Sequence, residues 1–177
     1  MRTAYIGMGG NLDSWAGTPD ATLAAAVLRL ESLGHLVGRS SLYSTAPVGF
    51  HDQPRFVNAV VALETELEPR ELLSGLLAIE TEFGRDRTAG FANGPRTLDL
   101  DILLLEELEI SEPELVIPHP RLAERTFVLM PLNEIAAAVV VPGRGKTVAQ
   151  LLDRLLESSR EEADAVVVLP NDAWDDR

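Results

Sequence analysis

Hydrophobic residues in this chain alternate between two spacings, and this alternation limits the folds that the chain can adopt. Segments with the pattern of β-strands are 3–8, 35–43, 56–66 and 97–105. Segments with helical spacing are 18–34 and 68–84, and each has a proline in its first turn. The order is therefore β-α-β-β-α-β. It predicts an α+β fold, a ferredoxin-like sandwich in which helices pack on one face of an antiparallel sheet.

The remainder of the chain predicts a C-terminal extension to this sandwich. Helices are expected over 125–136 and 147–158, and a short strand over 165–169. With 177 residues and no repeat or linker, the chain has the size of one ordinary domain. We expect a single domain over 1–158 and an acidic tail over 159–177.

Composition excludes several classes of protein. There is no cysteine, which excludes disulfides, thiolate metal sites and cysteine nucleophiles. A formal net charge of −13 argues against a nonspecific nucleic-acid binder or a protein that binds anionic membranes. No apolar run is long enough to cross a membrane, and the first residues do not resemble a signal peptide. We therefore expect a cytoplasmic monomer that binds small molecules, not nucleic acid or membranes.

Two aspartates stand within the strongest strand pattern. Asp99 and Asp101 alternate with Leu98, Leu100 and Ile102, so both carboxylates share one face while the apolar residues enter the core. Oxygen ligands without thiolates favour magnesium. The alternative is a solvated strand face with no metal.

Arginine supplies 14 of the 15 basic residues. Five arginines are grouped between residues 84 and 125: Arg85, Arg87, Arg96, Arg121 and Arg125. Guanidinium groups suit forked contacts with phosphate, although surface positions are the alternative. Neither a Walker loop nor a G-x-G-x-x-G motif is present. Phosphates would therefore be held by side chains and metal.

Three polar residues stand where apolar or structural residues are expected. Glu80 lies within the apolar arc of its helix, so its carboxylate must be paired, protonated or directed to solvent. Asn58 shares a strand face with Phe56, and the two could hold a flat ring by stacking and amide contacts; a satisfied amide in a packed core is the alternative. His119, between two prolines, could donate to phosphate or be structural. Long loops at 44–54 and 85–95 are typical of lids.

Ordered motifs over residues 4–136 together resemble the 6-hydroxymethyl-7,8-dihydropterin pyrophosphokinase family of folate biosynthesis. They are Ala4-Tyr5-Ile6-Gly7, Gly9-Gly10-Asn11-Leu12, 43–49, Asp52-Gln53-Pro54, Phe56-Val57-Asn58-Ala59, Ile79-Glu80, 84–87, 94–101, 118–121 and 125–129. The string GPRTLDLD at 94–101 is highly specific.

The resemblance implies an ATP-dependent pyrophosphokinase (2-amino-4-hydroxy-6-hydroxymethyldihydropteridine diphosphokinase). Such an enzyme transfers pyrophosphate from ATP to the hydroxymethyl group of the pterin and releases AMP. It implies catalytic roles for Arg85, Arg96, Asp99 and Asp101, with two Mg²⁺ ions held by the two aspartates. It implies pterin contacts at Thr45, Pro47, Val48, Phe56, Asn58 and Phe127, and ATP contacts at Glu80, Arg87, Ile102, His119 and Arg125.

The chain departs from the family pattern in one loop. Family members commonly carry Arg-Trp or Arg-Phe before Gly-Pro-Arg, whereas this chain has Ala92-Asn93. We expect Phe91 to supply the missing aromatic cover.

Two other classes of function remain open at this stage. A nucleotidyltransferase also uses Gly-Gly and Asp-x-Asp, but there the two motifs are usually about one helix apart. A non-catalytic ligand-sensing domain of the same fold would not need paired carboxylates. The products distinguish the three: AMP, pyrophosphate or none.

Overall fold

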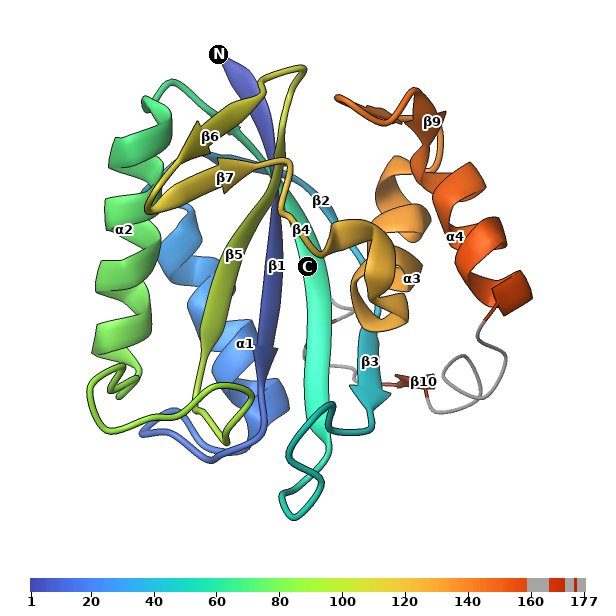
Figure 1. Ribbon diagram of the computed structural model, residues 1–177. Helices are drawn as coiled ribbons and strands as arrows, with labels where there is room; N and C mark the ends of the chain where they lie inside the picture. Colours follow the sequence, from blue (N-terminus) through green and yellow to red (C-terminus); the bar gives the residue numbers. More distant parts are fainter. Residues whose placement is uncertain (159–165, 171–173, 175–177) are drawn as a thin grey trace.

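The computed structural model describes residues 1–158, 166–170 and 174. Its centre is a six-stranded antiparallel sheet in the order β10-β3-β4-β1-β5, with β2 also paired to β4 (Figure 1). The strands are β1 (Arg2–Gly10), β2 (His35–Arg39), β3 (Leu42–Thr45), β4 (Phe56–Thr65), β5 (Asp99–Leu105) and β10 (Val166–Leu169). Apart from the added β10, this is the ferredoxin-like arrangement that the sequence predicts, and the predicted fold class is confirmed.

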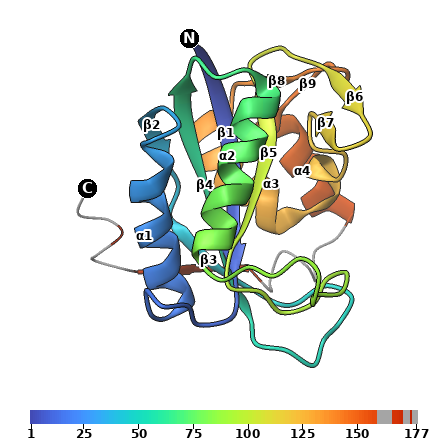
Figure 2. The same ribbon diagram turned by 90° about the vertical axis from the view of Figure 1, so that its left-hand side faces the viewer.

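Helices cover both faces of the sheet, not one. On one face lie α1 (Pro19–Leu30) and α2 (Pro69–Glu82) (Figure 2). On the other lies α3 (Thr126–Ala136), with α4 (Val148–Ser158) packed against it. The two helices of the predicted β-α-β-β-α-β core therefore lie on a single face, as expected. The C-terminal extension covers apolar residues that point to the second face.

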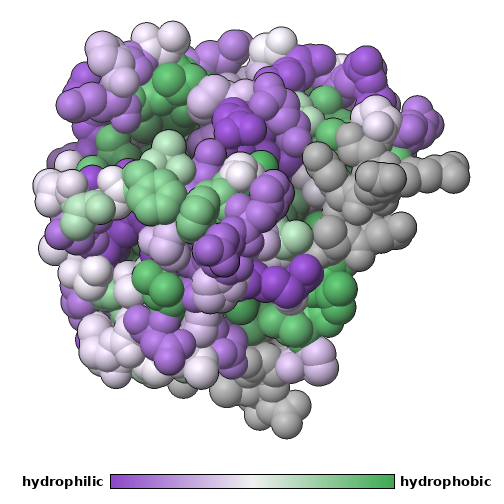
Figure 3. Space-filling view, turned by 60° about the horizontal axis from the view of Figure 1, so that its bottom comes forward, coloured by the Kyte–Doolittle hydropathy of each residue, from purple (hydrophilic) through white to green (hydrophobic). Residues whose placement is uncertain are grey.

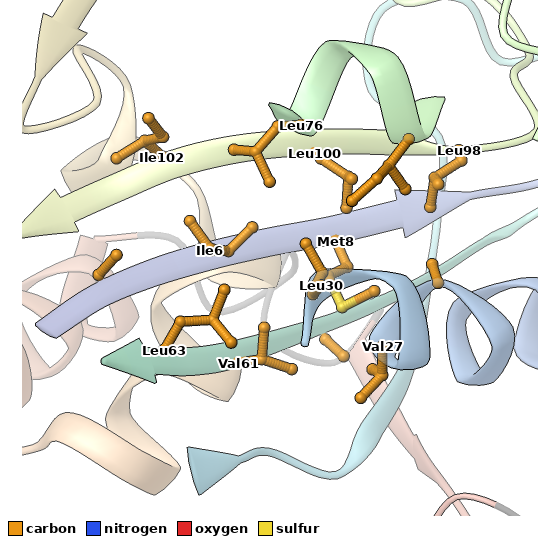
Figure 4. Packing of buried hydrophobic residues seen from close by; sticks show 14 of the residues in the cluster. Ile6, Met8, Val27, Leu30, Val61, Leu63, Leu76, Leu98, Leu100 and Ile102 are labelled. Atoms are coloured by element: carbon orange, nitrogen blue, oxygen red, sulfur yellow. The ribbon is translucent and has the colours of Figure 1, made fainter. Parts of the chain in front are cut away.

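Alternate residues of the strands supply two hydrophobic cores. The first lies between the sheet and α1 and α2; Figure 4 shows Ile6, Met8, Val61 and Leu63 of the sheet facing Leu76 of α2 and residues of α1. The second lies between the sheet and the α3–α4 pair and takes Val60 from β4. Strand β4 thus faces both cores because successive side chains point to opposite faces.

The strand predicted over 35–43 is divided in two. Ser40 interrupts it: the Val60 amide donates to Ser40 Oγ (2.9 Å) while the Ser40 amide donates to the Val60 carbonyl (2.9 Å). The register to β4 shifts by one residue between Arg39 and Tyr43, as at a β-bulge. Short elements that sequence periodicity missed are β6 (Ile110–Glu112), β7 (Leu115–Ile117), η1 (Leu122–Glu124), β8 (Val140–Val141) and β9 (Lys146–Thr147).

The predicted helix boundaries agree with the structure except at the end of α1, which was expected at Gly34. Helix α2 begins after Glu68, whose amide donates to Glu71 Oε2 (2.9 Å), as the proline at the first helical position predicts. Helix α1 ends at Leu30, before Gly34. Gly34 instead passes against the Glu64 carbonyl, where a side chain would not fit.

Candidate active site

The floor of the candidate site is formed by β5 and β1. Asp99 and Asp101 of β5 pair across the ladder with Gly9 and Gly7 of β1. Because the glycines have no side chains, the sheet surface beside both carboxylates is left open, and these residues line one pocket together with His119 and Arg125. The two aspartates share a face, as the sequence predicts.

Glycines 9 and 10 lie inside β1, which continues two residues beyond the strand predicted over 3–8. A Cβ at Gly9 would lie 2.5 Å from Asn58 Oδ1, and one at Gly10 would overlap the Thr97 carbonyl. Glycine is therefore required by close approach of neighbouring groups. The glycine pair is visible in the sequence, but glycines at the end of a strand pattern also fit a turn. The sequence alone therefore does not reveal the close approach of neighbouring groups.

Three arginines converge on Asp99. Arg96 Nε lies 3.2 Å from Asp99 Oδ2, and Nη2 atoms of Arg85 and Arg87 each lie 3.8 Å from Asp99 Oδ1. Arg85 Nε is buried and has no hydrogen-bond partner among the described residues. A buried donor of this kind is available to an acceptor on a bound molecule. Three of the five arginines grouped in the sequence, Arg85, Arg87 and Arg96, therefore lie together around Asp99.

Glu80 is paired, which was one of the three states open to it. The residue is 1% exposed. Its Oε1 accepts from the Leu100 amide (2.8 Å), and Arg87 donates to both carboxylate oxygens (2.8 and 2.9 Å). Burial raises the pKa of Glu80, while the hydrogen bonds from Leu100 and Arg87 lower it. Glu80 therefore joins the end of α2 to the edge of β5 and orients Arg87 toward Asp99.

Charge is unusually concentrated around Asp101. Burial and the nearby Asp99 and Glu80 carboxylates raise the pKa of Asp101 to about 6. Burial and then Arg125 lower the pKa of His119 to about 4, so its imidazole is neutral at pH 7. His119 Nδ1 accepts from the Arg121 amide (3.2 Å), which leaves the proton on Nε2 as a donor.

An aromatic pocket adjoins this floor. Phe56 and Asn58 come from β4, Thr45 from the end of β3 and Phe127 from α3. Asn58 Nδ2 donates to Thr45 Oγ1 (2.6 Å), so the amide is satisfied and held in place. Residues that line the pocket are Thr45, Val48, Phe56, Asn58, Asn93, Arg96, Arg125 and Phe127.

Both aromatic rings of this pocket carry a guanidinium over them. The Arg96 Cζ atom lies 4.7 Å from the Phe56 ring centroid, and Arg125 Cζ lies 5.5 Å from that of Phe127. Flat, electron-poor groups therefore already occupy the ring faces, as cation–π contacts. Pro47 lies half-buried in the loop after β3 and is absent from the pocket lining.

A second cleft, of ≈ 480 Å³, runs along the outer edge of β5. Its lining includes Arg87, Asp101, Ile102 and His119, four of the predicted site residues. The Leu100 amide points outward to Glu80. Ile102, two residues on, directs its backbone to the same edge because backbone groups alternate along a strand. The floor pocket that holds both aspartates lies between the edge cleft and the aromatic pocket, because it shares Asp101 and His119 with the edge cleft and Asn58 and Phe127 with the aromatic pocket.

The two long loops predicted as lids are joined to each other. Asn11, at the end of β1, accepts from the Arg96 amide (2.9 Å) and donates to Gln53 Oε1 (2.9 Å) and the Pro54 carbonyl (2.9 Å). Gln53 Nε2 in turn donates to the Asn93 carbonyl (2.7 Å). The sequence alone assigned no role to Asn11 or Gln53, although both lie within the motifs that resemble the family.

Phe91 is 60% exposed, and its ring packs edge-on against Phe50 of the other loop, with centroids 5.3 Å apart. It lines a cavity of ≈ 410 Å³ under its own loop, and not the aromatic pocket. Asn93 lines that pocket instead, with a left-handed backbone (φ 60°). Figure 3 shows this end of the molecule, where small hydrophobic areas are interspersed with hydrophilic ones.

The chemistry of the donor set fits a hard divalent cation. Within residues 1–158, 166–170 and 174, no group of three or more His, Asp and Glu side chains gathers to hold a metal. Asp99 and Asp101 alone would leave most coordination positions for water and phosphate oxygens, as Mg²⁺ sites beside nucleotides commonly do. The raised pKa of Asp101 marks uncompensated negative charge that a cation would neutralise. The fold and this site define a phosphate-transferring enzyme domain.

Comparison with known proteins identifies the family. Residues 5–137 match the model of 7,8-dihydro-6-hydroxymethylpterin-pyrophosphokinase (HPPK). A 2-amino-4-hydroxy-6-hydroxymethyldihydropteridine pyrophosphokinase from Haemophilus influenzae is 47% identical over 144 residues, or 80% of this chain and 86% of that protein. One of the same name from Methylorubrum extorquens is 42% identical over 93% of this chain and all of its own length. The chain belongs to the HPPK family, and the resemblance is confirmed.

Solved structures agree with this assignment at the level of fold. A Plasmodium falciparum HPPK-DHPS triple mutant with SDX-DHP superposes with a TM-score of 0.72 at 15% identity, over 94% of this chain. The chain spans 47% of the length of that solved chain. In the part of the chain that the structure describes, no helix is long and apolar enough to cross a membrane.

Proposed function

We propose that this chain transfers pyrophosphate from ATP to the hydroxymethyl group of 6-hydroxymethyl-7,8-dihydropterin and releases AMP, the activity of the family to which it belongs. The observation that carries the proposal is that the floor pocket, which holds Asp99 and Asp101, shares lining residues with two differently built pockets, the aromatic pocket and the edge cleft. One pocket is aromatic with a fixed amide, and the other is an open cleft beside arginines. A reaction with two substrates needs both.

The aromatic pocket suits the pterin. A flat heterocycle between Phe56 and Phe127 would replace the guanidinium groups that now lie over these rings. Asn58, held by Thr45, would offer matched donor and acceptor groups to the ring edge. We assign Pro47 and Val48 to the pterin side through the loop that leaves β3.

The edge cleft suits ATP. Ile102 would present backbone groups from the outer edge of β5, where a base can be bound as a further strand would be. Arg87, Arg125 and His119 Nε2 would donate to phosphate oxygens, and Glu80 would position Arg87. Arg85 and Arg96 border the 85–95 loop and would neutralise charge on the transferred group.

Asp99 and Asp101 would hold Mg²⁺, and we propose two ions. When bound, the metal supplies positive charge to the phosphate oxygens and helps to align them. The hydroxymethyl oxygen forms a bond to the β-phosphorus of ATP and releases its proton to solvent. The bond from that phosphorus to the α–β bridging oxygen breaks, and AMP leaves with that oxygen. The residues of this chain contribute positioning and charge neutralisation, which dominate phosphoryl transfer.

We also propose a monomeric, cytoplasmic enzyme. All residues assigned to the two substrates come from a single chain, so the site needs no second subunit. The absence of cysteine and the use of ATP support the location. Light scattering at assay concentrations tests the monomer.

The decisive experiment incubates the protein with ATP, Mg²⁺ and reduced hydroxymethylpterin and identifies the products. AMP with the pterin diphosphate supports the proposal. Release of pyrophosphate would indicate a nucleotidyltransferase, and no turnover would indicate a ligand-sensing domain. Asp99→Ala and Asp101→Ala should each abolish AMP release with unchanged circular dichroism, because both side chains line the floor pocket and belong to neither hydrophobic core. Turnover near that of the unsubstituted chain would refute the metal assignment.

A further inference from the structure

The C-terminal part of the chain returns to the sheet and holds its edge. Strand β10 pairs antiparallel with β3 along its whole length, from Val166 opposite Thr45 to Leu169 opposite Leu42. Trp174 is 1% exposed, and its Nε1 donates to the Ser40 carbonyl (2.8 Å). The pairing with β10 holds β3 along its length, and the Trp174 hydrogen bond holds Ser40, just before β3 begins. We call Val166–Leu169 and Trp174 the C-terminal strap.

The anchoring of Trp174 is strong for a residue so near the end of the described chain. Its side chain belongs to the first hydrophobic core, and the Arg39 guanidinium lies over its ring, 4.9 Å from the centroid. A buried tryptophan removes a large apolar area from water and adds a hydrogen bond. Leu169, half-buried, packs against the same core.

Strand β3 is the element that the strap holds, and it forms one wall of the aromatic pocket. It has only four residues, of which three pair with β4. Its last residue, Thr45, fixes the Asn58 amide, and the 46–55 loop leaves directly after it. Val166 lies opposite Thr45 and on the same face of the sheet, because directly paired residues share a face.

We propose that the C-terminal strap is a positioning element for the pterin pocket and that Trp174 is its anchoring residue. The proposal rests on the assignment of the aromatic pocket to the pterin. Without the strap, β3 would be a four-residue edge strand, and such strands open locally at low cost. The Thr45–Asn58 pair would then be formed in only a fraction of molecules. The apparent dissociation constant for the pterin rises in inverse proportion to that fraction.

The strap should act on one substrate only. The edge cleft lies along β5, at the opposite edge of the sheet, with β4 and β1 between it and β3. Loosening of β3 leaves the contacts of Glu80, Arg87 and Ile102 in place. A general loss of stability would instead weaken both sites together, and this difference makes the proposal testable.

The experiment compares Trp174→Ala with the unsubstituted full-length chain by calorimetric titration. Pterin is titrated in the presence of Mg²⁺ and a non-hydrolysable ATP analogue, and the analogue is titrated alone. We expect the pterin dissociation constant to rise roughly tenfold, as a tenfold drop in the competent fraction requires. The constant for the ATP analogue should stay within about twofold. Trp174→Phe, which keeps most of the buried ring, should restore most of the pterin affinity.

The matched control is Val27→Ala, a truncation in the same core on α1, a helix that packs on β1, α2 and β4. It should lower the melting temperature and leave the ratio of the pterin and ATP-analogue dissociation constants unchanged. Hydrogen exchange at 42–45 should accelerate in Trp174→Ala and not in Val27→Ala, while exchange at 99–105 stays unchanged in both. If Trp174→Ala does not fold, Leu169→Ala is measured by the same criteria.

The strap proposal is overturned if a folded strap variant binds pterin as tightly as the unsubstituted chain. It is equally overturned if both affinities fall together, or if Val27→Ala weakens pterin binding to the same extent. Failure of the unsubstituted chain to bind pterin would overturn the assignment of the aromatic pocket and the strap proposal with it. Unchanged pterin binding in the variants alone would overturn the strap proposal and leave the proposed function intact.

Discussion

The pKa values of single residues at the centre of this site are shifted by the fold toward the neutral forms of their side chains. Asp101 has a raised pKa, and the pKa of His119 is lowered, each because of burial first and of neighbouring charges second. Glu80 is fully buried and depends on Arg87 for its counter-charge. Such arrangements lower stability and are typical of sites shaped for binding charged substrates.

The lowered pKa of His119 predicts a pH dependence of stability. Between pH 6.5 and about 4 the unfolded chain binds a proton at this imidazole and the folded chain does not. The contribution of His119 is therefore fully present above pH 6.5 and is lost as the pH falls toward 4. From pH 7 to 5 the unsubstituted chain should lose on the order of 1 kcal/mol more stability than His119→Gln, after allowance for partial exposure. Urea unfolding at both pH values measures this, and equal losses would contradict it.

Arg87 should be more important for stability than its exposure suggests. Its side chain is 51% exposed, yet it is the cation paired with the buried Glu80 carboxylate. Arg87→Ala should cost about 2 kcal/mol at neutral pH because it leaves that charge buried and unpaired. The cost should shrink toward pH 5, since Glu80 has a raised pKa and would take up a proton.

The control for this prediction is Arg70→Ala. Arg70 pairs with Glu112 at the surface, where both side chains are exposed, and its loss should cost less than about 1 kcal/mol. Equal effects of the two substitutions in urea unfolding would show that the Glu80 carboxylate does not depend on Arg87.

At the scale of elements, periodicity predicts what is regular in this chain and misses what depends on distant contacts. The first, third and fourth strands and all four helices follow from local spacing, and the shared face of Asp99 and Asp101 follows from the period of two. Placement of α3 on the second face does not, because an amphipathic helix fits either face equally well.

The remaining misses have the same origin. Ser40 divides β2 from β3 through hydrogen bonds to Val60, twenty residues away. Gly9 and Gly10 are required by Asn58 and Thr97, which local sequence cannot reveal. The helix position of Glu80 limits its carboxylate to three states: paired, protonated or directed to solvent. Only the fold brings Arg87 and the Leu100 amide to it as partners. Asn93 enters the aromatic pocket through a left-handed backbone conformation that no sequence pattern predicts.

The two lid loops should behave as one unit because Phe50 and Phe91 pack together. Phe50→Ala and Phe91→Ala should each raise the pterin KM severalfold, and the double variant should be little worse than either, with a coupling energy of about 1 kcal/mol. ATP affinity should hardly change, since neither ring lines the edge cleft.

Steady-state kinetics of this double-mutant cycle test the coupling. Leu28→Ala, an exposed apolar truncation on α1, should leave both KM values unchanged. Additive effects of the two phenylalanine substitutions would show that the loops move independently.

At the scale of the whole molecule, one sheet serves two cores, the aromatic pocket and the edge cleft. Strand β4 directs Val61 to the core under α1 and α2 and Val60 to the core under α3. Phe56 and Asn58 continue that second face into the aromatic pocket, while β5 carries the aspartates and the edge cleft. The site therefore exists only while both layers of helices are in place.

This shared sheet predicts that the domain unfolds in a single step. Leu76→Ala in α2 and Leu132→Ala in α3 each empty a fully buried position, in the first and second core respectively. Each should lower the free energy of unfolding by about 2–5 kcal/mol. Far-ultraviolet circular dichroism reports helices of both layers. Tryptophan fluorescence reports the first core, through Trp174 within it and Trp15 stacked on Phe83. In urea the two probes should give one midpoint for each variant, shifted in the same direction, because loss of either layer exposes a face of β4 and β1.

If Leu132→Ala shifted the dichroism transition and left the fluorescence midpoint in place, the α3–α4 layer would be an independent unit. The aromatic pocket would then depend on a layer that can separate from the sheet.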